Sequence, residues 1–465
     1  MTEAAEPQSH KAREQSGAAG FSPRGCWPSR TAPIAVLLLM LAGVANVEVF
    51  QGMCFAQEED DERFVVILTR EVITNTGKDI DKGIIVLDAG KIHNVGRGLE
   101  YPLNAKIIDA RDRVVMPGLI NPHTRYGLPG YKRSGVHGNL SVVDEYYPPP
   151  GVYDELLDAG YTALALMPDG SGIPGRAIVV RTAGPEEERT LLAPAYLRVT
   201  ADKRTLRGAL EKAQKEIEKV EKAREEFEQK QKKLEEEQKK EAEQQKKPGK
   251  AEQKEPATKP ATQPTTQPAF KPPPIDPAHQ ALVDLIQEKP DIFALIELNS
   301  ASDFVHMSEV LEEFEIAHHF YARYSYQSDL EYVLERMGER ELKIILQPRI
   351  GRVPYSAERL HLVRMISAAG CEVSLTPLDD STREHQRILS RIAELVREGW
   401  PRAEALKSVT LYPARLLGLD ARLGSIEKGK DADLIFLDAD PLDPTARVRE
   451  VMIAGEVVQR VEDSD

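Results

Sequence analysis

Between residues 114 and 420, short apolar runs alternate with stretches of helical periodicity, and this alternation constrains the fold more than any other feature of the sequence. The apolar runs lie at residues 114–120, 162–167, 292–298, 342–346 and 371–375. Helical periodicity separates several of them, at residues 329–337, 357–369 and 385–398. Strands that alternate with helices predict a parallel β/α architecture.

The segments on either side of this region are rich in short strands. Between residues 63 and 115, apolar runs are bounded by Gly, Asn or Asp, and residues 84–87 and 92–95 flank a turn in the manner of a hairpin. Strand patterns return within residues 420–461. The sequence therefore predicts a β/α middle between two strand-rich ends.

Charge and cysteine content exclude several classes of protein. The 465 residues include 61 Lys and Arg against 75 Asp and Glu, a net charge of −14. This acidic balance argues against a broad nucleic-acid surface, which needs clustered cations. The three cysteines cannot build a disulfide framework, and only Cys371 lies beyond the N-terminal segment. No CxxC pair is present, which excludes a zinc ribbon and a dithiol redox site.

The first 57 residues predict a targeting segment. A polar stretch at residues 1–30 precedes an apolar run at residues 33–47, whose core of about 13–15 residues is shorter than the roughly 20 of a membrane-spanning helix. We expect a signal peptide, cleaved after Ala45 or Ala56, and an exported (periplasmic or extracytoplasmic) protein. Two alternatives are an uncleaved membrane anchor at residues 33–47 and a mis-assigned start codon before a buried helix.

Residues 202–277 interrupt the β/α pattern. Within them, residues 206–247 carry 13 Lys and Arg and 12 Glu, and their heptad pattern decays after two heptads. We expect a single charged helix about 60 Å long, followed by an extended linker with nine prolines at residues 248–277. A coiled coil that forms a homo-oligomer through residues 206–247 is the alternative. Deleting residues 205–275 is expected to leave a soluble barrel.

Two motifs bracket the β/α region. The first reads Val115-Met-Pro-Gly-Leu-Ile-Asn-Pro-His123, and the second reads Thr410-Leu-Tyr-Pro-Ala-Arg-Leu-Leu-Gly-Leu419 followed by Leu423-Gly-Ser-Ile-Glu-Lys-Gly-Lys-Asp-Ala-Asp433. Together they resemble the motifs of the amidohydrolase superfamily of metal-dependent hydrolases, particularly its imidazolonepropionase-like and dihydroorotase-like members.

The resemblance implies an α/β fold, in which a (β/α)8 TIM-type barrel is joined to a small β-sandwich. Residues 63–115 and 420–461 would form the sandwich, residues 116–201 and 278–419 the barrel, and residues 202–277 a long charged helical insertion. About 230 residues then remain for the barrel, just under the roughly 250 that are typical.

The resemblance also implies a metal site, and two of its residues are matched. His123 takes the position of the first histidine after strand 1, and Asp380 takes that of the aspartate after strand 8, with Asp379 as the less favoured neighbour. Both are expected zinc ligands, and Asp380 is also the expected catalytic carboxylate. In this superfamily the metal lowers the pKa of a bound water to give hydroxide.

The remaining positions depart from the superfamily pattern. Arg125 stands where the second strand-1 histidine belongs, and Asn299 stands at the strand-5 histidine. His318 and His319 precede the strand-6 run instead of following it, and residues 196–200 offer no lysine after strand 4. Because guanidinium cannot coordinate a cation, we expect Arg125 to pair with Asp380 and to exclude zinc. Changing Arg125→His is then expected to raise the affinity for zinc.

Three functions follow from this incomplete ligand set. The first is hydrolysis of carbon–nitrogen (non-peptide) bonds, such as those of cyclic amides, at a reduced metal site that holds zinc if it holds any metal. The alternative is a catalytically inactive barrel that serves as an exported binding or assembly protein. A metal-free hydrolase with Asp380 as general base is the third. The expected ligand is a small molecule, or a protein partner in the case of the inactive barrel, and no nucleic acid is expected.

Overall fold

The structure, a computed structural model, describes residues 64–200, 202–244, 269–287, 292–323, 329–340, 342–353 and 355–460. The predicted signal or anchor within residues 1–57 lies outside the described residues, as do residues 245–268 of the proline-rich stretch. Among the helices of the described ranges, none is long and apolar enough to cross a lipid bilayer.

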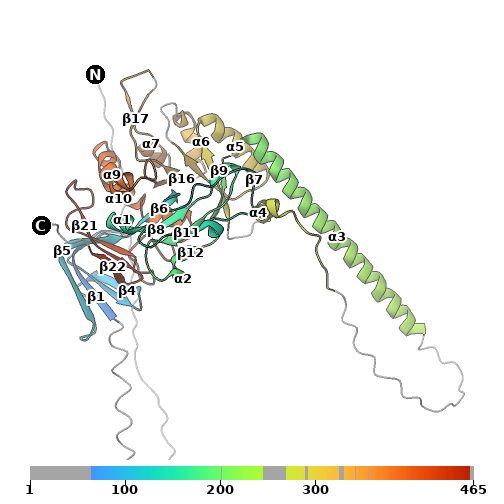
Figure 1. Ribbon diagram of the computed structural model, residues 1–465, viewed down its shortest axis with the longest axis horizontal. Coiled ribbons are helices and arrows are strands. Elements are labelled where there is room, and N and C mark those ends of the chain that lie inside the picture. The colour runs from blue at the N-terminus through green and yellow to red at the C-terminus, as the bar shows by residue number, and fades with distance from the viewer. Residues whose placement is uncertain are drawn as a thin grey trace, which may run out of the picture. The chain divides into compact units, whose positions relative to one another are not determined.

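One sheet holds the strands from both ends of the chain (Figure 1). Its N-terminal strands are β1 (Phe64–Val72), β2 (Ile80–Asp81), β3 (Gly83–Asp88), β4 (Lys91–Arg97) and β5 (Lys106–Pro117), and its C-terminal strands are β20 (Leu434–Leu437), β21 (Val448–Ile453) and β22 (Glu456–Arg460). The order is β22-β21-β20-β5-β1-β3-β4, with β2 on β1. β5 joins the two halves, since it runs parallel to β1 and antiparallel to β20.

The predicted contact between the two ends is confirmed. Ile85 and Ile92 share a buried cluster with Leu434 and Phe436, and β3 and β4 form the expected antiparallel hairpin. The strands are nevertheless hydrogen-bonded as one eight-stranded sheet and not as the two separate sheets of the expected sandwich. The reason is that β5 is long enough to be paired along both edges.

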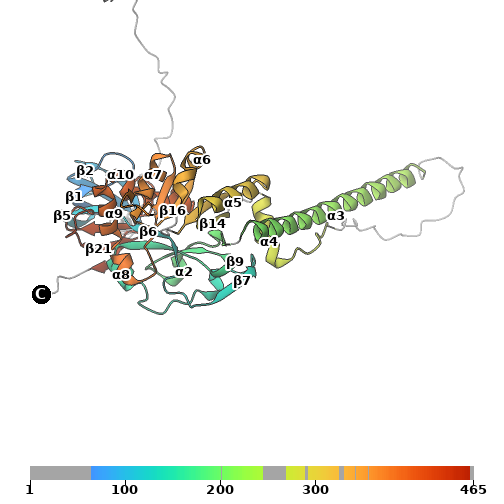
Figure 2. The same cartoon turned by 90° about the horizontal axis from the view of Figure 1, so that it is seen from above.

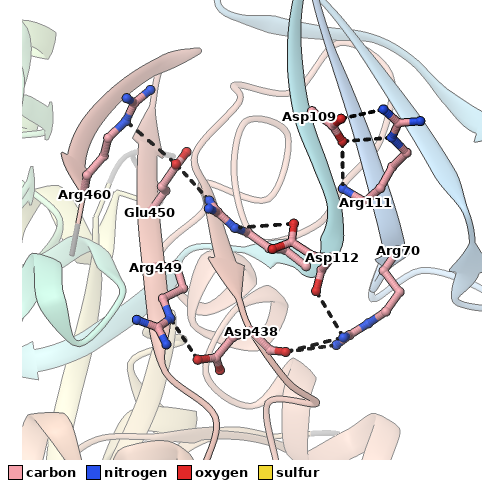
Figure 3. A network of polar contacts seen from close by, with 9 residues as sticks. Arg70, Asp109, Arg111, Asp112, Asp438, Arg449, Glu450 and Arg460 are labelled. Atoms are coloured by element: carbon pink, nitrogen blue, oxygen red, sulfur yellow. Dashed lines mark hydrogen bonds and ion pairs between the residues drawn. The ribbon is translucent and has the colours of Figure 1, made fainter. Parts of the chain in front are cut away.

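Charged side chains tie the strands together on the solvent side of this sheet (Figure 3). Arg70 of β1 donates to the backbone carbonyls of Asp112 and Asp438 at 3.1 and 3.4 Å. Arg449 pairs with Asp438 at 2.8 Å, and Arg460 lies 3.8 Å from Glu450. Such exposed pairs add little stability individually, but they keep this face polar.

Two further sheets supply the strands of the predicted barrel. The larger consists, in order, of β10 (Gly175–Arg176), β13 (Tyr196–Val199), β14 (Phe293–Leu298), β15 (His318–Ala322), β16 (Lys343–Leu346) and β19 (Glu372–Leu375). Its strands from β13 to β19 are all parallel. The smaller consists, in order, of β12 (Thr190–Leu192), β11 (Ile178–Arg181), β8 (Tyr161–Leu166) and β6 (Leu119–Thr124), and β6 is parallel to β8.

Hydrogen bonds join the two sheets at both edges. The backbone N–H of Ala177 donates to the carbonyl of Tyr196 at 2.8 Å, and the hydroxyl of Thr376 lies 3.0 Å from the carbonyl of His123. Ala177, between β10 and β11, thus pairs with β13, while Thr376, directly after β19, contacts the end of β6.

The regular (β/α)8 order is broken at the third strand. β11 runs antiparallel to β8, because the connection between them holds only the short strands β9 (Asp169–Ile173) and β10. A parallel return needs a crossover of about a dozen or more residues, usually with a helix. β9 instead pairs with β7 (Lys132–Val136) in a separate ribbon.

Helices follow the strands from β13 onward, as the alternation predicts. The helical elements are η2 (Val142–Glu145), α1 (Asp154–Asp158), α2 (Glu186–Arg189), α3 (Lys203–Gln244), α4 (Pro277–Ile286), α5 (Ala301–Glu313), η3 (Leu330–Val333), α6 (Leu334–Gly338), α7 (Leu362–Ala368), α8 (Thr382–Gln386), α9 (Ile388–Arg397), α10 (Arg402–Lys407) and α11 (Leu411–Leu416). A two-stranded ribbon of β17 (Gly351–Arg352) and β18 (Arg359–Leu360) precedes α7.

Helix α3 confirms the predicted charged helix and is 42 residues long. Its apolar residues Leu206, Leu210, Ala213 and Ile217 are buried, and its first turns contact α4 and α5. Farther along, the helix extends away from the barrel strands (Figures 1 and 2). The first two heptads are therefore covered by the same chain, and pairing between two chains stays a prediction for the exposed remainder.

Candidate functional site

A cavity of about 430 Å³ opens at the carboxyl ends of β6, β15, β16 and β19. His123, Tyr321, Arg323, Gln347, Arg349 and Asp380 are among the residues that line it. Barrel enzymes carry their active sites at this end of the strands. A larger hollow of about 860 Å³ lies along β1, β5 and β22, but no predicted site residue lines it.

His123 is fixed in the cavity wall by its backbone and by one ring nitrogen. A Cβ at Gly118, where the chain enters β6, would overlap the side chain of Thr162, so this glycine lets β6 and β8 approach. The Nδ1 atom of His123 lies 3.1 Å from the hydroxyl of Tyr196, and Nε2 is buried without a hydrogen-bond partner. Burial and the guanidinium groups of Arg198 and Arg323 hold the pKa of His123 well below its usual value, so the ring is neutral.

Asp380 lines the cavity from the loop between β19 and α8. Its carboxylate accepts hydrogen bonds from the hydroxyl of Thr124 at 2.5 Å and from the backbone N–H of Arg125 at 3.2 Å. The neighbouring Asp379 accepts from the backbone N–H of Ser381 at 2.9 Å, and hydrogen bonds from Ser381 lower the pKa of Asp379. The structure therefore brings both predicted residues, His123 and Asp380, to one cavity.

Two arginines line the same cavity. Arg323 follows β15 and Arg349 follows β16, and both line the cavity. Behind them Glu297 lies 3.0 Å from the buried guanidinium of Arg198 and 3.7 Å from that of Arg323. One carboxylate thus serves two guanidinium groups.

Arg125 does not make the contact expected of it. Its guanidinium donates to the carbonyls of Met167 at 2.8 Å and Pro129 at 2.5 Å, and only its backbone N–H reaches Asp380. The predicted ion pair between the Arg125 guanidinium and Asp380 is therefore wrong. Nearby carbonyls on the loop after β6 and at the end of β8 satisfy the guanidinium instead.

The other expected ligand positions lie away from the cavity. Asn299 is exposed, and its backbone N–H donates to Asp303 in the first turn of α5. His318 and His319 begin β15, at the opposite end of the strand from Tyr321 and the cavity. His318 contacts the carbonyl of Ile316 at 2.7 Å, and the ring of His319 packs on Phe293 at 4.5 Å. Neither histidine is placed to share a metal with His123.

Sequence reasoning missed a buried polar network behind His123. The Nδ1 atom of His385 contacts the carbonyl of Ser381 at 2.9 Å, and its Nε2 lies 3.1 Å from the amide nitrogen of Asn121. The amide oxygen of Asn121 in turn accepts from the backbone N–H of His123 at 3.1 Å and from Thr376 at 2.9 Å. Asn121 belongs to the first motif and lies two residues before His123, which was the available signal for this role.

The comparisons with known proteins agree with the motifs. A model described as the amidohydrolase family matches residues 362–458. The N-acetylglucosamine-6-phosphate deacetylase of Bos taurus is 34% identical over 91 residues, 20% of this chain and 19% of that protein. The dihydroorotase of Geotalea daltonii is 29% identical over 100 residues, 21% of this chain and 20% of that protein. The C-terminal part of the chain is therefore similar to the amidohydrolase family.

A solved structure supports the fold independently. An amidohydrolase structure from Thermotoga maritima MSB8 matches with a TM-score of 0.66 and 20% identity, covering 85% of this chain and 100% of that one. This likeness indicates a TIM-barrel-type fold of mixed α/β content. The chain spans about a fifth of the length of the deacetylase and of the dihydroorotase.

The residues present do not fit the metal that is typical of the superfamily. Zinc in proteins takes three or four side-chain donors. His123, Asp379 and Asp380 line the cavity, but Asp379 accepts a hydrogen bond from the backbone N–H of Ser381. Across the described ranges, no group of three or more His, Cys, Asp or Glu side chains is placed to hold a metal ion. The cations Arg323 and Arg349 in the same wall would oppose a further divalent charge.

Proposed function

We propose that this protein binds a small polar molecule in the cavity without a zinc ion and is catalytically inactive. The observation that supports it is the composition of the cavity wall, where two arginines accompany one neutral imidazole and two aspartates, and these donors form no group placed to hold a metal within the described ranges. Without metal-bound hydroxide, the usual nucleophile of these hydrolases is missing. The cavity itself, with its convergent polar groups, remains suited to holding a ligand.

Metal analysis tests this proposal. The purified full chain should contain far less than one equivalent of zinc by mass spectrometry, and calorimetric titration with zinc chloride should show no tight site. One equivalent of tightly held zinc would overturn the proposal.

A second candidate function is metal-free hydrolysis of a carbon–nitrogen bond, with Asp380 as general base. The position of Asp380 favours it, since the carboxylate is exposed at the cavity and held by two hydrogen bonds. The relatives named deacetylase and dihydroorotase suggest N-acetyl compounds and cyclic amides as first substrates. Turnover of either class that is lost in Asp380→Asn and unaffected by chelators would favour this candidate over pure binding.

We also propose that residues 1–57 direct the chain out of the cytoplasm. The support is the polar stretch followed by the short apolar run at residues 33–47. Fusing residues 1–57 to a reporter that is active only after export should give activity. Reporter activity equal to that of an unfused control would overturn the assignment.

A further inference from the structure

We infer that the buried guanidinium of Arg198 stands in for the metal ion in this protein. It supplies a fixed positive charge near the carboxyl ends of the barrel strands, holds the carboxylate of Glu297, and keeps divalent cations out. The inference deepens the proposed function. It rests on the zinc-free binding site proposed there, and it names the residue that makes this site zinc-free.

Arg198 belongs to a charged layer between the two barrel sheets. Tyr196, Leu295 and Tyr321 come from three adjacent parallel strands and share one buried cluster with residues of the smaller sheet. Side chains two residues apart on a strand point to the same face. Arg198 and Glu297 therefore continue this face toward the carboxyl ends of β13 and β14, where barrel enzymes carry their reacting groups.

The guanidinium of Arg198 connects groups from both sheets. It donates to the carbonyl of Pro168, two residues after the end of β8, at 2.7 Å. It also donates to the carboxylate of Glu297 on β14 at 3.0 Å. On the same strand as Arg198, the hydroxyl of Tyr196 lies 3.1 Å from Nδ1 of His123. The buried cation is thus bonded to the ends of β8 and β14, and its strand neighbour contacts the predicted metal ligand His123.

This buried cation is costly to keep. The side chain of Arg198 is 7% exposed, and its Nε donor is buried without a hydrogen-bond partner. Apolar residues of similar volume are often as stable as a buried ion pair, or more so, so stability does not explain why a guanidinium is present. Its charge does oppose any further cation at the same place, because like charges repel strongly where little water screens them.

The inference is tested by vacating the position of the guanidinium. In full-length Arg198→Ala this position is open to cations from solution, and free guanidinium is the first probe. Guanidinium chloride at about 10 mM is too dilute to denature, and it should raise the midpoint of thermal unfolding of the variant by about 1–2 °C. It should leave the midpoint of the parent unchanged. Urea at the same concentration is the control, since it has the same planar shape without the charge.

Zinc is the second probe and shows whether the vacated position accepts a metal ion. In calorimetric titration, zinc should bind Arg198→Ala at least about tenfold more tightly than the parent, because the repelling charge is gone and the carboxylate of Glu297 is released. Adding Glu297→Gln should remove this gain. Arg359→Ala is the control, since Arg359 is an exposed arginine paired with Glu398, and its zinc affinity should equal that of the parent.

Two results would overturn the inference. One is that zinc binds Arg198→Ala no more tightly than it binds the parent, and the other is that guanidinium raises the midpoint no more than urea does. If Arg198→Ala is insoluble, its soluble yield is compared between media with and without added zinc. Added zinc should raise that yield, and equal yields would overturn the inference.

The failure of this inference is distinguishable from that of the proposed function. Zinc in the purified parent would overturn the proposed function. A zinc-free parent whose Arg198→Ala variant gains no zinc affinity would overturn the role of Arg198 alone.

Discussion

Arg125 anchors the loop after β6 through the carbonyls of Met167 and Pro129. An imidazole cannot span both acceptors, so Arg125→His should lose about 1–3 kcal/mol of unfolding free energy. It should also gain no measurable zinc affinity, contrary to the expectation from sequence, because Asn299 still lies outside the cavity. Urea unfolding and calorimetric titration with zinc check the two parts.

The control for this prediction is Arg111→His on the exposed side of β5. Arg111 pairs with Asp109 at the surface, and its side chain is 69% exposed, so the substitution should change stability by less than about 1 kcal/mol. A large rise in zinc affinity for Arg125→His would show that position 125 does face the cavity.

The site was predictable from the sequence where a motif fixed the end of a strand. His123 and Asp380 each follow a recognisable apolar run, and both line the cavity. Arg323 and Arg349 were not predicted, because no motif marks the ends of β15 and β16 that they follow. Which end of a strand faces a site depends on its direction in the sheet, and a single strand does not reveal that direction.

At the scale of elements, helix α3 has two parts with different roles. Leu210 is fully buried near α4 and α5, whereas Leu234 is 55% exposed. Leu210→Ala should therefore cost about 2–5 kcal/mol of unfolding free energy, and Leu234→Ala should stay within about 0.5 kcal/mol. Chemical denaturation of the two variants compares identical substitutions on one helix. Equal effects would mean that the first turns of α3 do not contribute to the core.

The burial of the first turns of α3 changes the result expected from deleting residues 205–275. That deletion would remove the buried residues Leu206 and Leu210, so we now expect it to destabilise the protein. Deleting residues 228–268 should instead preserve the fold, because the rings of Phe227 and Phe270 lie 5.4 Å apart and a short Gly/Ser linker can join the ends. Thermal unfolding should show a midpoint close to that of the parent for the shorter deletion, and soluble expression should fall for the longer one.

The strand–helix alternation predicted most elements, but it did not predict the direction of β11. Residues 176–181 have the pattern of a strand in either direction. They pair antiparallel with β8 because the connection before them is short. The glycine-rich sequence of that connection does not show whether the chain turns back directly or makes a longer crossover. The burial of the first turns of α3 was also not predicted, because their partners α4 and α5 come after the linker in the sequence.

At the scale of the whole molecule, Arg181 links the barrel strand β11 to the chain that leads into the C-terminal strands. Its guanidinium lies 2.9 Å from Asp431 and 3.2 Å from Asp433, and all three side chains are buried. Arg181→Leu should lose about 3–5 kcal/mol, because two buried carboxylates are left without this cation. Urea unfolding measures the loss, with the exposed Arg359→Leu as control. A loss no larger than that of the control would mean that the network contributes little.

The sheet that joins the two ends of the chain can be completed only late in the synthesis of the protein. Val114 of β5 pairs with Leu437 of β20, and a ribosome working at about 5–20 residues per second adds the second partner tens of seconds after the first. Until then one edge of β5 is open to other chains, and such edges promote aggregation. A chain stopped after residue 433 never closes that edge and should sediment with the insoluble fraction, whereas one stopped after residue 460 should remain in the supernatant.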